Sequence, residues 1–219
     1  MMRKRLEEEL ARVESDVLGL GETVEQALRA SVAALVSRDL DASRRIIDDD
    51  RRVNERRFAI EADILVLIAT QQPIARDLRL LAALLEINTE IERTGDYAKG
   101  ISRINLLIGD RPLIKPLVDI PIMVAKATDM MHRALRAFAE RDVATCRAIP
   151  REDDEMDALY NRVNSDLMAL VVQDVSNLEQ ANYLIWAAHN LERAADRVTN
   201  ICERLIFTVT GEMSELDSH

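Results

Sequence analysis

The chain has 219 residues, a formal net charge of −10 at pH 7 and 48% hydrophobic residues. This length and hydrophobic content exclude a disordered chain and suit one large domain or two small ones with a real core. The acidic balance argues against binding to nucleic acid, which needs a basic surface, and favours cations or basic protein surfaces. Only 3% of residues are aromatic and only 6 are glycine, so the composition predicts an all-helical fold.

The first predicted helix covers about residues 3–37. Apolar residues recur at alternating spacings of four and three, a heptad pattern typical of a long amphipathic helix. Gly19 and Gly21 weaken this helix by about 1 kcal/mol each relative to alanine, without ending it. The seam that we expect to pack into the core comprises Leu6, Leu10, Val13, Val17, Leu20, Val24 and Ala27.

Two more helices complete the first half of the chain. Asp39 is suited to cap a helix that runs to Gln71, and Pro73 stops this helix because proline cannot continue it. The same proline suits the first turn of a third helix, over about 74–108. Asp77 falls in that first turn, at the positive end of the helix, where a capping salt bridge is the simplest role. The expected inward residues of the third helix are Leu78, Leu81, Leu85, Ile91, Ala98, Ile101 and Ile108.

One linker divides the chain. Residues 109–116 hold one glycine and two prolines, which break any helix. Beyond the linker we expect three further helices and a polar, frayed tail, over about 121–140, 142–173, 177–210 and 211–219. The predicted domains are therefore residues 1–110 and 111–219.

The second half repeats the first. A shift of 103 residues places Arg38-Asp39 on Arg141-Asp142, and after the second turn the shift drops to 100. Two signatures of the form Glu-Arg-x-x-Asp then coincide, one in each half. Such self-similarity indicates a duplicated three-helix unit. Short connections make neighbouring helices antiparallel, so we predict an all-α fold of two tandem three-helix bundles with six long helices.

The cysteines and the hydropathy pattern bear on the compartment. Cys146 and Cys202 have no framework spacing, and no signal-peptide pattern is present, so we expect free thiols in a reducing cytoplasm. The sequence contains no uncharged apolar run of about 18 residues that would span a membrane. We therefore expect a cytoplasmic protein that reaches the membrane only through its partners.

Each signature places two carboxylates one helical turn apart. Glu92 and Asp96 share one face of their helix, and Glu192 and Asp196 share the matching face of theirs. Like charges at this spacing cost a helix about 0.2–0.5 kcal/mol unless a cation sits between them. The carboxylates lie one residue, or about 100° around the helix, from apolar positions, so we expect them at the bundle surface or in a shallow groove.

The middle helix of each repeat carries polar residues that should face these pairs. Asp50 with Asn54, and Asp153 with Asp157, also lie one turn apart, and antiparallel packing brings them level with the signatures. Carboxylate oxygens that face one another make a site for hard or borderline cations such as Fe(III), Mn(II), Mg(II) or Ca(II). A thiolate zinc site is excluded because the sequence has no Cys/His cluster.

A simpler interpretation stays open. Arg93 and Arg193 could pair with Asp96 and Asp196 as surface salt bridges, because their i, i+3 spacing is common on solvated helices. His189, three residues before Glu192, could add a ligand, although a surface histidine is the simpler role.

The sequence shows no catalytic constellation. It has no Gly-rich phosphate loop, no nucleophile elbow and no histidine within helical reach of a serine or cysteine. A ferritin-like di-iron centre would need two Glu-x-x-His motifs, and the sequence has none. We therefore expect no enzymatic activity. The alternative is a metal-dependent hydrolase that uses the surface carboxylates, and it lacks a general base beyond the ligands themselves.

Together these residues resemble the PhoU family, the regulators of phosphate uptake and phosphate-starvation signalling in bacteria. The resemblance covers essentially the whole chain, and its motifs are Gln71-Gln72-Pro73, Asp77-Leu78-Arg79, Ile91 to Ala98, Leu191 to Asp196 and Thr199 to Glu203. It implies two three-helix bundles with metal clusters at the bundle surface. Iron or zinc is the implied metal, with Mn or Mg as further candidates.

The resemblance also implies a ligand set. Carried over residue by residue, the metal-site positions are Asp50, Asn54, Glu92, Asp96, Asp153, Asp157, Glu192 and Asp196. Asn54 stands where the family pattern has a second carboxylate, and an amide is a weaker, neutral ligand. We therefore expect the site of the first repeat to hold fewer ions or none.

The implied role is regulatory. Proteins of this family act as cytoplasmic adaptors between the ATPase subunit of a phosphate ABC transporter and a sensor histidine kinase. When phosphate is plentiful they keep the starvation genes switched off. We expect a homodimer with no enzymatic activity. The alternatives are an accessory protein of another phosphate permease and a helical scaffold without metal.

Overall fold

The protein is described by a computed structural model that covers residues 2–213, 215 and 216. No strand occurs in this described part, so the all-helical prediction is confirmed. Of the predicted polar tail, residues 214, 217, 218 and His219 lie outside the described residues. The helices are α1 (Met2–Ser37), α2 (Leu40–Gln71), α3 (Ala75–Ile108), α4 (Asp119–Glu140), α5 (Val143–Ala148), η1 (Ile149–Glu152), α6 (Asp153–Gln173), η2 (Val175–Asn177) and α7 (Leu178–Thr210).

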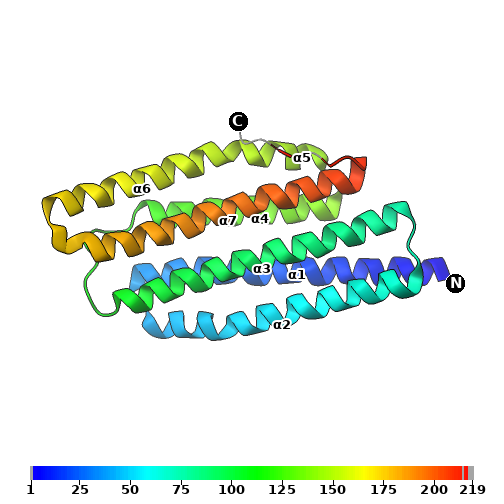
Figure 1. Cartoon of the computed structure of the whole chain (residues 1–219), viewed down its shortest axis with the longest axis horizontal. Coiled ribbons are helices and arrows are strands. Elements are labelled where there is room, and N and C mark those ends of the chain that lie inside the picture. The colour runs from blue at the N-terminus through cyan, green and yellow to red at the C-terminus, as the bar shows by residue number, and fades with distance from the viewer. Residues whose placement is uncertain (1, 214, 217–219) are drawn as a thin grey trace.

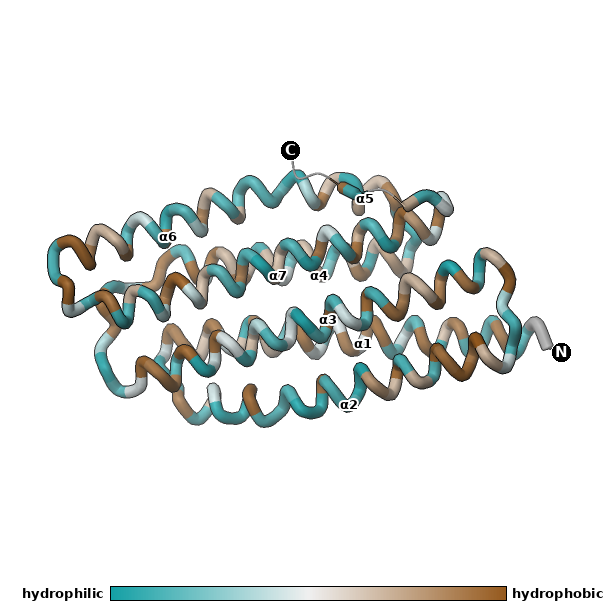
Figure 2. The backbone as a smooth tube through the Cα atoms, in the orientation of Figure 1, coloured by the Kyte–Doolittle hydropathy of each residue, from teal (hydrophilic) through white to brown (hydrophobic). Residues whose placement is uncertain are grey.

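The long helices form two three-helix bundles that lie side by side in an elongated molecule (Figure 1). The first repeat consists of α1, α2 and α3, and the second repeat consists of α4, α6 and α7 with the short helices between them. Short turns reverse the chain within each repeat, as expected for antiparallel neighbours. Figure 2 shows that the middle of α2 is largely hydrophilic, whereas hydrophobic residues gather toward its C-terminal end.

The turn after the first helix has the same geometry in both repeats. Arg38 and Arg141 both adopt the left-handed conformation, with φ of 59° and 60°. The next residue then caps the following helix. The Ala42 amide donates to Asp39 Oδ1 at 2.8 Å, and the Thr145 amide donates to Asp142 Oδ1 at 3.1 Å. The predicted cap at Asp39 is confirmed, and the shared geometry agrees with a duplicated unit.

The prediction of one continuous helix over 142–173 is wrong. The chain forms the short helix α5, passes through one 3₁₀ segment, and begins α6 only at Asp153. Pro150 lies in that segment, and a proline removes a helical hydrogen bond and clashes with the preceding turn. The first repeat has no proline at the matching place, so α2 is unbroken.

Burial along the first and third helices follows the heptad pattern with local corrections. The α1 seam is buried from Leu6 to Val24, but it continues through Leu28, and Ala27 is only partly buried. On α3 the prediction for Leu78 is wrong, because this side chain is 44% exposed. Leu85 is only partly buried. Both lie one residue off the buried face, whose heptad members are Asp77, Leu81, Leu84, Asn88, Ile91, Gly95 and Ala98.

The third helices of the two repeats make the most extensive contact in the molecule. They run antiparallel, so the second half of each faces the first half of the other (Figure 1). Glu90 accepts hydrogen bonds from Arg197 at 3.3 Å and from Asn200 at 3.0 Å. Gly100 lies opposite Asn190, where a Cβ would come within 2.9 Å of the amide nitrogen. A larger residue at this position would displace the Asn190 side chain, so the glycine leaves room for that amide between α3 and α7.

Three further observations concern the apolarity of the helices, the linker and the two cysteines. None of the described helices is long and apolar enough to cross a membrane. Residues 109–118 connect the repeats without helix, as predicted, and they are held to α7 by Gln180, which accepts from the Ile114 amide at 2.6 Å. Cys146 and Cys202 are buried free thiols. A hydrogen bond between these two thiols, together with burial, raises the pKa of Cys202.

Candidate metal-binding site

Four predicted ligands of the second repeat lie on α6 and α7 near enough for their charges to act on one another, and we call Asp153, Asp157, Glu192 and Asp196 the second cluster. The break at Pro150 places Asp153 in the first turn of α6, while Glu192 and Asp196 lie in the middle of α7. Burial raises the pKa of Asp153 to about 6, and the charges of Asp196 and Asp157 add to the rise. Burial also raises the pKa of Glu192 to about 7, again reinforced by Asp196, Asp157 and Asp153. The carboxylates thus raise one another's pKa, although the charges of Arg193 and Arg197 partly offset the rise at Asp196.

Two oxygens of the second cluster have no hydrogen-bond partner although they are buried: Asp153 Oδ1 and Glu192 Oε2. His189 Nδ1 lies 3.2 Å from Glu192 Oε2, but the pair does not meet hydrogen-bond geometry. A buried carboxylate oxygen without a donor is costly. Such oxygens, facing like charges, are what a bound cation would satisfy.

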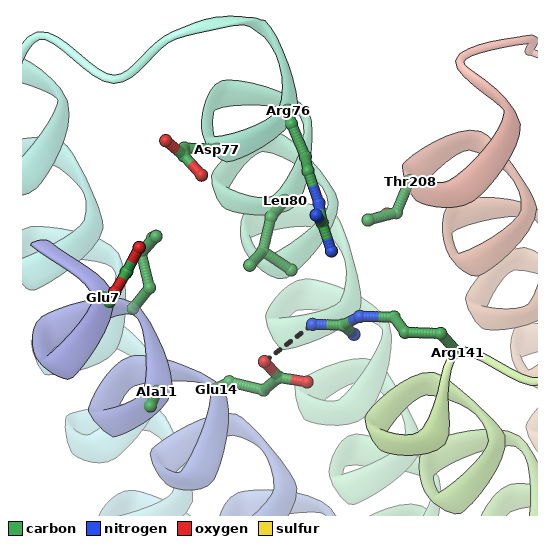
Figure 3. Close-up of a pocket in the computed structure, with 9 residues that line it drawn as sticks. Glu7, Ala11, Glu14, Arg76, Asp77, Leu80, Arg141 and Thr208 are labelled. Carbon is green, nitrogen blue, oxygen red and sulfur yellow. Dashed lines mark hydrogen bonds and ion pairs between the residues drawn. The ribbon is translucent and has the colours of Figure 1, made fainter. Parts of the chain in front are cut away.

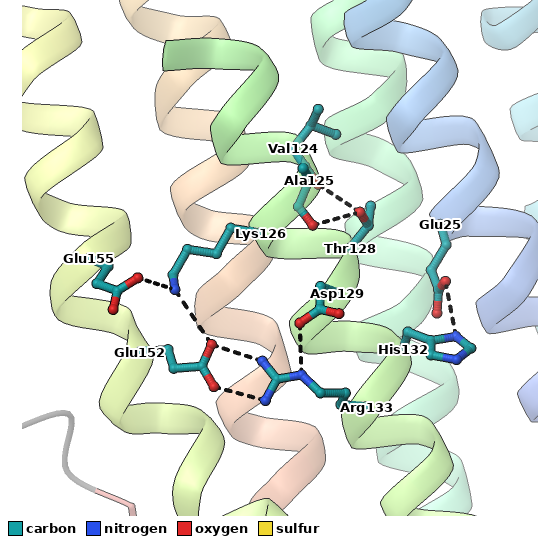
Figure 4. Close-up of polar contacts among 10 residues, drawn as sticks. All are labelled: Glu25, Val124, Ala125, Lys126, Thr128, Asp129, His132, Arg133, Glu152 and Glu155. Carbon is teal, nitrogen blue, oxygen red and sulfur yellow. Dashed lines mark hydrogen bonds and ion pairs between the residues drawn. The ribbon is translucent and has the colours of Figure 1, made fainter.

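Two acids next to the second cluster, Glu152 and Glu155, are paired with cations. Glu152 accepts from both terminal nitrogens of Arg133 at 2.8 Å, and Lys126 donates to Glu155 at 2.7 Å (Figure 4). These cations come from α4 (Figure 4). The guanidinium of Arg133 holds the pKa of Glu152 below its usual range. Glu152 and Glu155 are therefore engaged in ion pairs, and the second cluster is left without such partners.

The first repeat differs in its chemistry, and we call Asp50, Asn54, Glu92 and Asp96 the first cluster. Asp50 is buried, and its Oδ2 accepts from Lys99 Nζ at 2.6 Å and from Asn54 Nδ2 at 3.2 Å. Lys99 Nζ also lies 3.7 Å from Asp96 Oδ1. The pKa of Glu92 is raised, first by burial and then by the charge of Asp96.

The fit to a metal ion therefore differs between the clusters. The second cluster offers carboxylate oxygens with unsatisfied positions, which suits a hard cation. The first cluster already holds an ammonium group among its oxygens. Within the described residues, no three acidic, histidine or cysteine side chains converge closely enough to hold one ion. Carboxylates that repel one another stand apart, so the second cluster would have to draw together around a cation.

The two arginines that the simpler interpretation pairs with Asp96 and Asp196 contact other groups instead. Arg93 donates to Glu90 at 2.8 Å, and Arg193 lies over the ring of Tyr97 with 5.5 Å from Cζ to the ring centroid. Both arginines thus serve the contact between α3 and α7. Neither arginine therefore forms an ion pair with Asp96 or Asp196 among the described residues.

A separate hollow of about 270 Å³ lies between the repeats, where α1, α3 and α7 meet the end of α4 (Figure 3). Arg141 donates to Glu14 across it at 2.8 Å. Asp77 lines it and is buried, in the first turn of α3 as predicted. The lining mixes acidic and basic groups and contains no cysteine, serine or histidine nucleophile.

Sequence reasoning missed the groups that distinguish the two clusters. Lys99 lies three residues after Asp96 on the same helical face, and this spacing could have identified it. Lys126 and Arg133 reach Glu155 and Glu152 from another helix, so only the tertiary structure shows those pairs.

Taken together, the fold and the site define a class: a duplicated all-helical protein with acidic clusters between the helices of each repeat. The family model described as "PhoU domain" matches residues 17–104 and 120–205, one match in each repeat. The chain belongs to the PhoU family.

Three relatives are similar to this chain over nearly its whole length. The Deinococcus radiodurans protein named "Phosphate-specific transport system accessory protein PhoU homolog" is 33% identical over 210 residues, covering 96% of this chain and 99% of that protein. The crystal structure of the "phosphate transport system regulatory protein PhoU" from Streptococcus pneumoniae superposes with a TM-score of 0.89 at 27% identity, covering 96% of this chain and 100% of the other. PhoU from Pseudomonas aeruginosa gives 0.89 at 26% identity, with coverages of 94% and 99%. The first two of these relatives are named as accessory or regulatory proteins and not as enzymes, which agrees with the expected lack of catalysis and argues against the hydrolase alternative.

Proposed function

We propose that this chain is an accessory protein of a phosphate-specific transport system and a negative regulator of the phosphate-starvation response. The observation that carries the proposal is the match of both repeats to the family together with full-length similarity to a named transport accessory protein. The chain has the repeat architecture of its relatives and lacks a catalytic constellation in its sequence.

The proposed mode of action is that of a cytoplasmic adaptor. In it the protein, as a homodimer, contacts the ATPase subunit of a phosphate ABC transporter and a sensor histidine kinase. Exposed apolar side chains at the helical turns, such as Ile74, Val172 and Val175, offer contacts of the kind that docking requires. An accessory role for another phosphate permease is the second candidate.

We also propose that the second cluster binds a metal ion, with iron as the first candidate and zinc, manganese and magnesium as others. A bound cation would neutralise carboxylates from α6 and α7 and so fasten these helices to each other. The support is the unsatisfied buried oxygens and the raised pKa values of Asp153 and Glu192.

Deletion of the gene, with a reporter fused to a phosphate-starvation promoter, tests the regulatory role. In high phosphate the deletion strain is expected to express the reporter constitutively, and the wild-type gene should restore repression. Normal repression in the deletion strain would contradict the proposal. Affinity purification from the complemented strain then separates the candidates: recovery of an ABC-transporter ATPase supports the adaptor, and recovery of another permease supports the alternative.

A further inference from the structure

Lys99 occupies the first cluster as an internal cation. Its ammonium nitrogen is 2.6 Å from Asp50 Oδ2 and 3.7 Å from Asp96 Oδ1, so it bridges acids from α2 and α3. Asp50 is only 8% exposed, and the Lys99 side chain is 24% exposed. An ammonium at this distance forms a charge-assisted hydrogen bond, among the stronger polar contacts in proteins. The ion pair therefore ties α2 to α3 within the first cluster.

The alignment of the two repeats shows which residues occupy the matching positions in the second cluster. By the shift of 100 residues, the counterpart of Lys99 is Thr199. By the shift of 103, the counterpart of Asn54 is Asp157. The first cluster thus combines three carboxylates with an amide and an ammonium, while the second combines four carboxylates with a threonine. The second cluster alone has buried oxygens without donors among its carboxylates.

We propose that Lys99 takes the place of a metal ion in the first repeat, so that the chain binds metal only in the second. The inference rests on the metal-binding part of the proposed function and narrows it to one cluster. A divalent ion entering the first cluster would meet a positive charge at close range and would have to displace it from Asp50. Asn54, which donates to the same oxygen, adds to that barrier and is a poor replacement for a carboxylate ligand.

Manganese binding to metal-free protein tests the proposal, with Mn(II) titrated by calorimetry and bound ions counted by electron paramagnetic resonance. Wild type is expected to bind at the second cluster only. Changing Asp153→Asn with Asp196→Asn should weaken binding by at least about tenfold, whereas Asp50→Asn with Asp96→Asn should leave it within about twofold. The double change Lys99→Thr with Asn54→Asp should create an additional binding event.

The reciprocal change is Thr199→Lys, which should place an ammonium in the second cluster. We expect it to abolish Mn(II) binding and to raise the Tm of the metal-free protein by about 3 °C, while Lys99→Thr alone should lower Tm by a similar amount. Asn182→Lys, at an exposed position on the same helix, controls for added charge and should change neither quantity.

The outcomes separate this inference from the proposed function. If the changes at Asp50 and Asp96 remove part of the wild-type Mn(II) binding, metal binding stands and the inference about Lys99 is overturned. If neither wild type nor the Lys99→Thr, Asn54→Asp protein binds Mn(II), the metal-binding proposal fails. The Tm shifts then decide whether Lys99 is the cation of its cluster, and unchanged Tm in both Lys99→Thr and Thr199→Lys would refute that role.

Discussion

Glu25 is a buried carboxylate on α1 that faces α4 across the contact between the repeats (Figure 4). Its Oε1 has no hydrogen-bond partner, and His132 Nδ1 lies 3.5 Å from its Oε2. Burial raises the pKa of Glu25, the charges of His132 and Arg29 lower it, and Glu22 raises it further. The net result is a raised pKa, so the folded protein holds this proton more tightly than the unfolded chain does.

A carboxylate whose pKa is raised in the folded protein lowers the free energy of unfolding at pH values above the ordinary pKa of glutamate. Below about pH 4 the group is protonated in both states, and the cost vanishes; it grows as the pH rises through the folded-state pKa. We therefore predict that Glu25→Gln increases the free energy of unfolding by about 1 kcal/mol at pH 7.5, and that the gain disappears near pH 4. Urea unfolding across this pH range measures it. Glu55→Gln, at an exposed position on α2, is the control, and a gain that does not change with pH would contradict the explanation.

At the scale of the elements, the end of α2 is held by a residue with an unfavourable backbone. Gln72 caps the helix with φ of 48° and ψ of 58°, a left-handed conformation that costs residues other than glycine about 1–2 kcal/mol. Gln71, one residue earlier, is still helical. The two adjacent glutamines therefore provide a matched comparison of the same substitution.

We predict that Gln72→Gly raises the free energy of unfolding by about 0.5–1 kcal/mol, because glycine adopts the left-handed cap without strain although it costs more chain entropy. Gln71→Gly should lower stability by about 0.5–1 kcal/mol, since glycine is unfavourable within a helix. Denaturant midpoints of both variants and of wild type provide the measurement. Equal effects of the two substitutions would show that the cap conformation does not limit stability.

At the scale of the whole molecule, the contact between α3 and α7 makes the repeats one unit. Glu90 is its polar centre, because this buried carboxylate of the first repeat accepts from Arg197 and Asn200 of the second. Removing one partner of a partly buried charged network leaves the others without compensation, at a cost of about 3 kcal/mol.

We predict that Glu90→Ala lowers stability by about 3 kcal/mol and that both repeats lose protection together. Hydrogen–deuterium exchange read by mass spectrometry on peptides from α2 and from α6 measures this, since these helices lie on opposite outer sides of the molecule (Figure 1). Glu8→Ala, at an exposed site paired with Lys4, should leave both rates unchanged. Loss of protection confined to one repeat would show that the repeats unfold independently.

The sequence by itself determined the helical class, the duplication and the family. Periodicity reports which face of a helix is buried, and a repeated pattern reports a repeated unit, because both are local properties of the chain. The cap at Asp39 followed from local chemistry in the same way. The break at Pro150 has a local cause as well, and the prediction of one helix over 142–173 did not take this proline into account.

The tertiary structure alone decided how the polar groups pair. Glu152 and Glu155 lie beside Asp153 in the sequence, and only the structure shows that Arg133 and Lys126 on another helix pair with them. Likewise, the sequence already distinguishes the first cluster from the second by Asn54, but the contact of Lys99 with Asp50 on the neighbouring helix appears only in the structure. Charge compensation depends on distance in space, and residues 49 positions apart meet only after the helices pack.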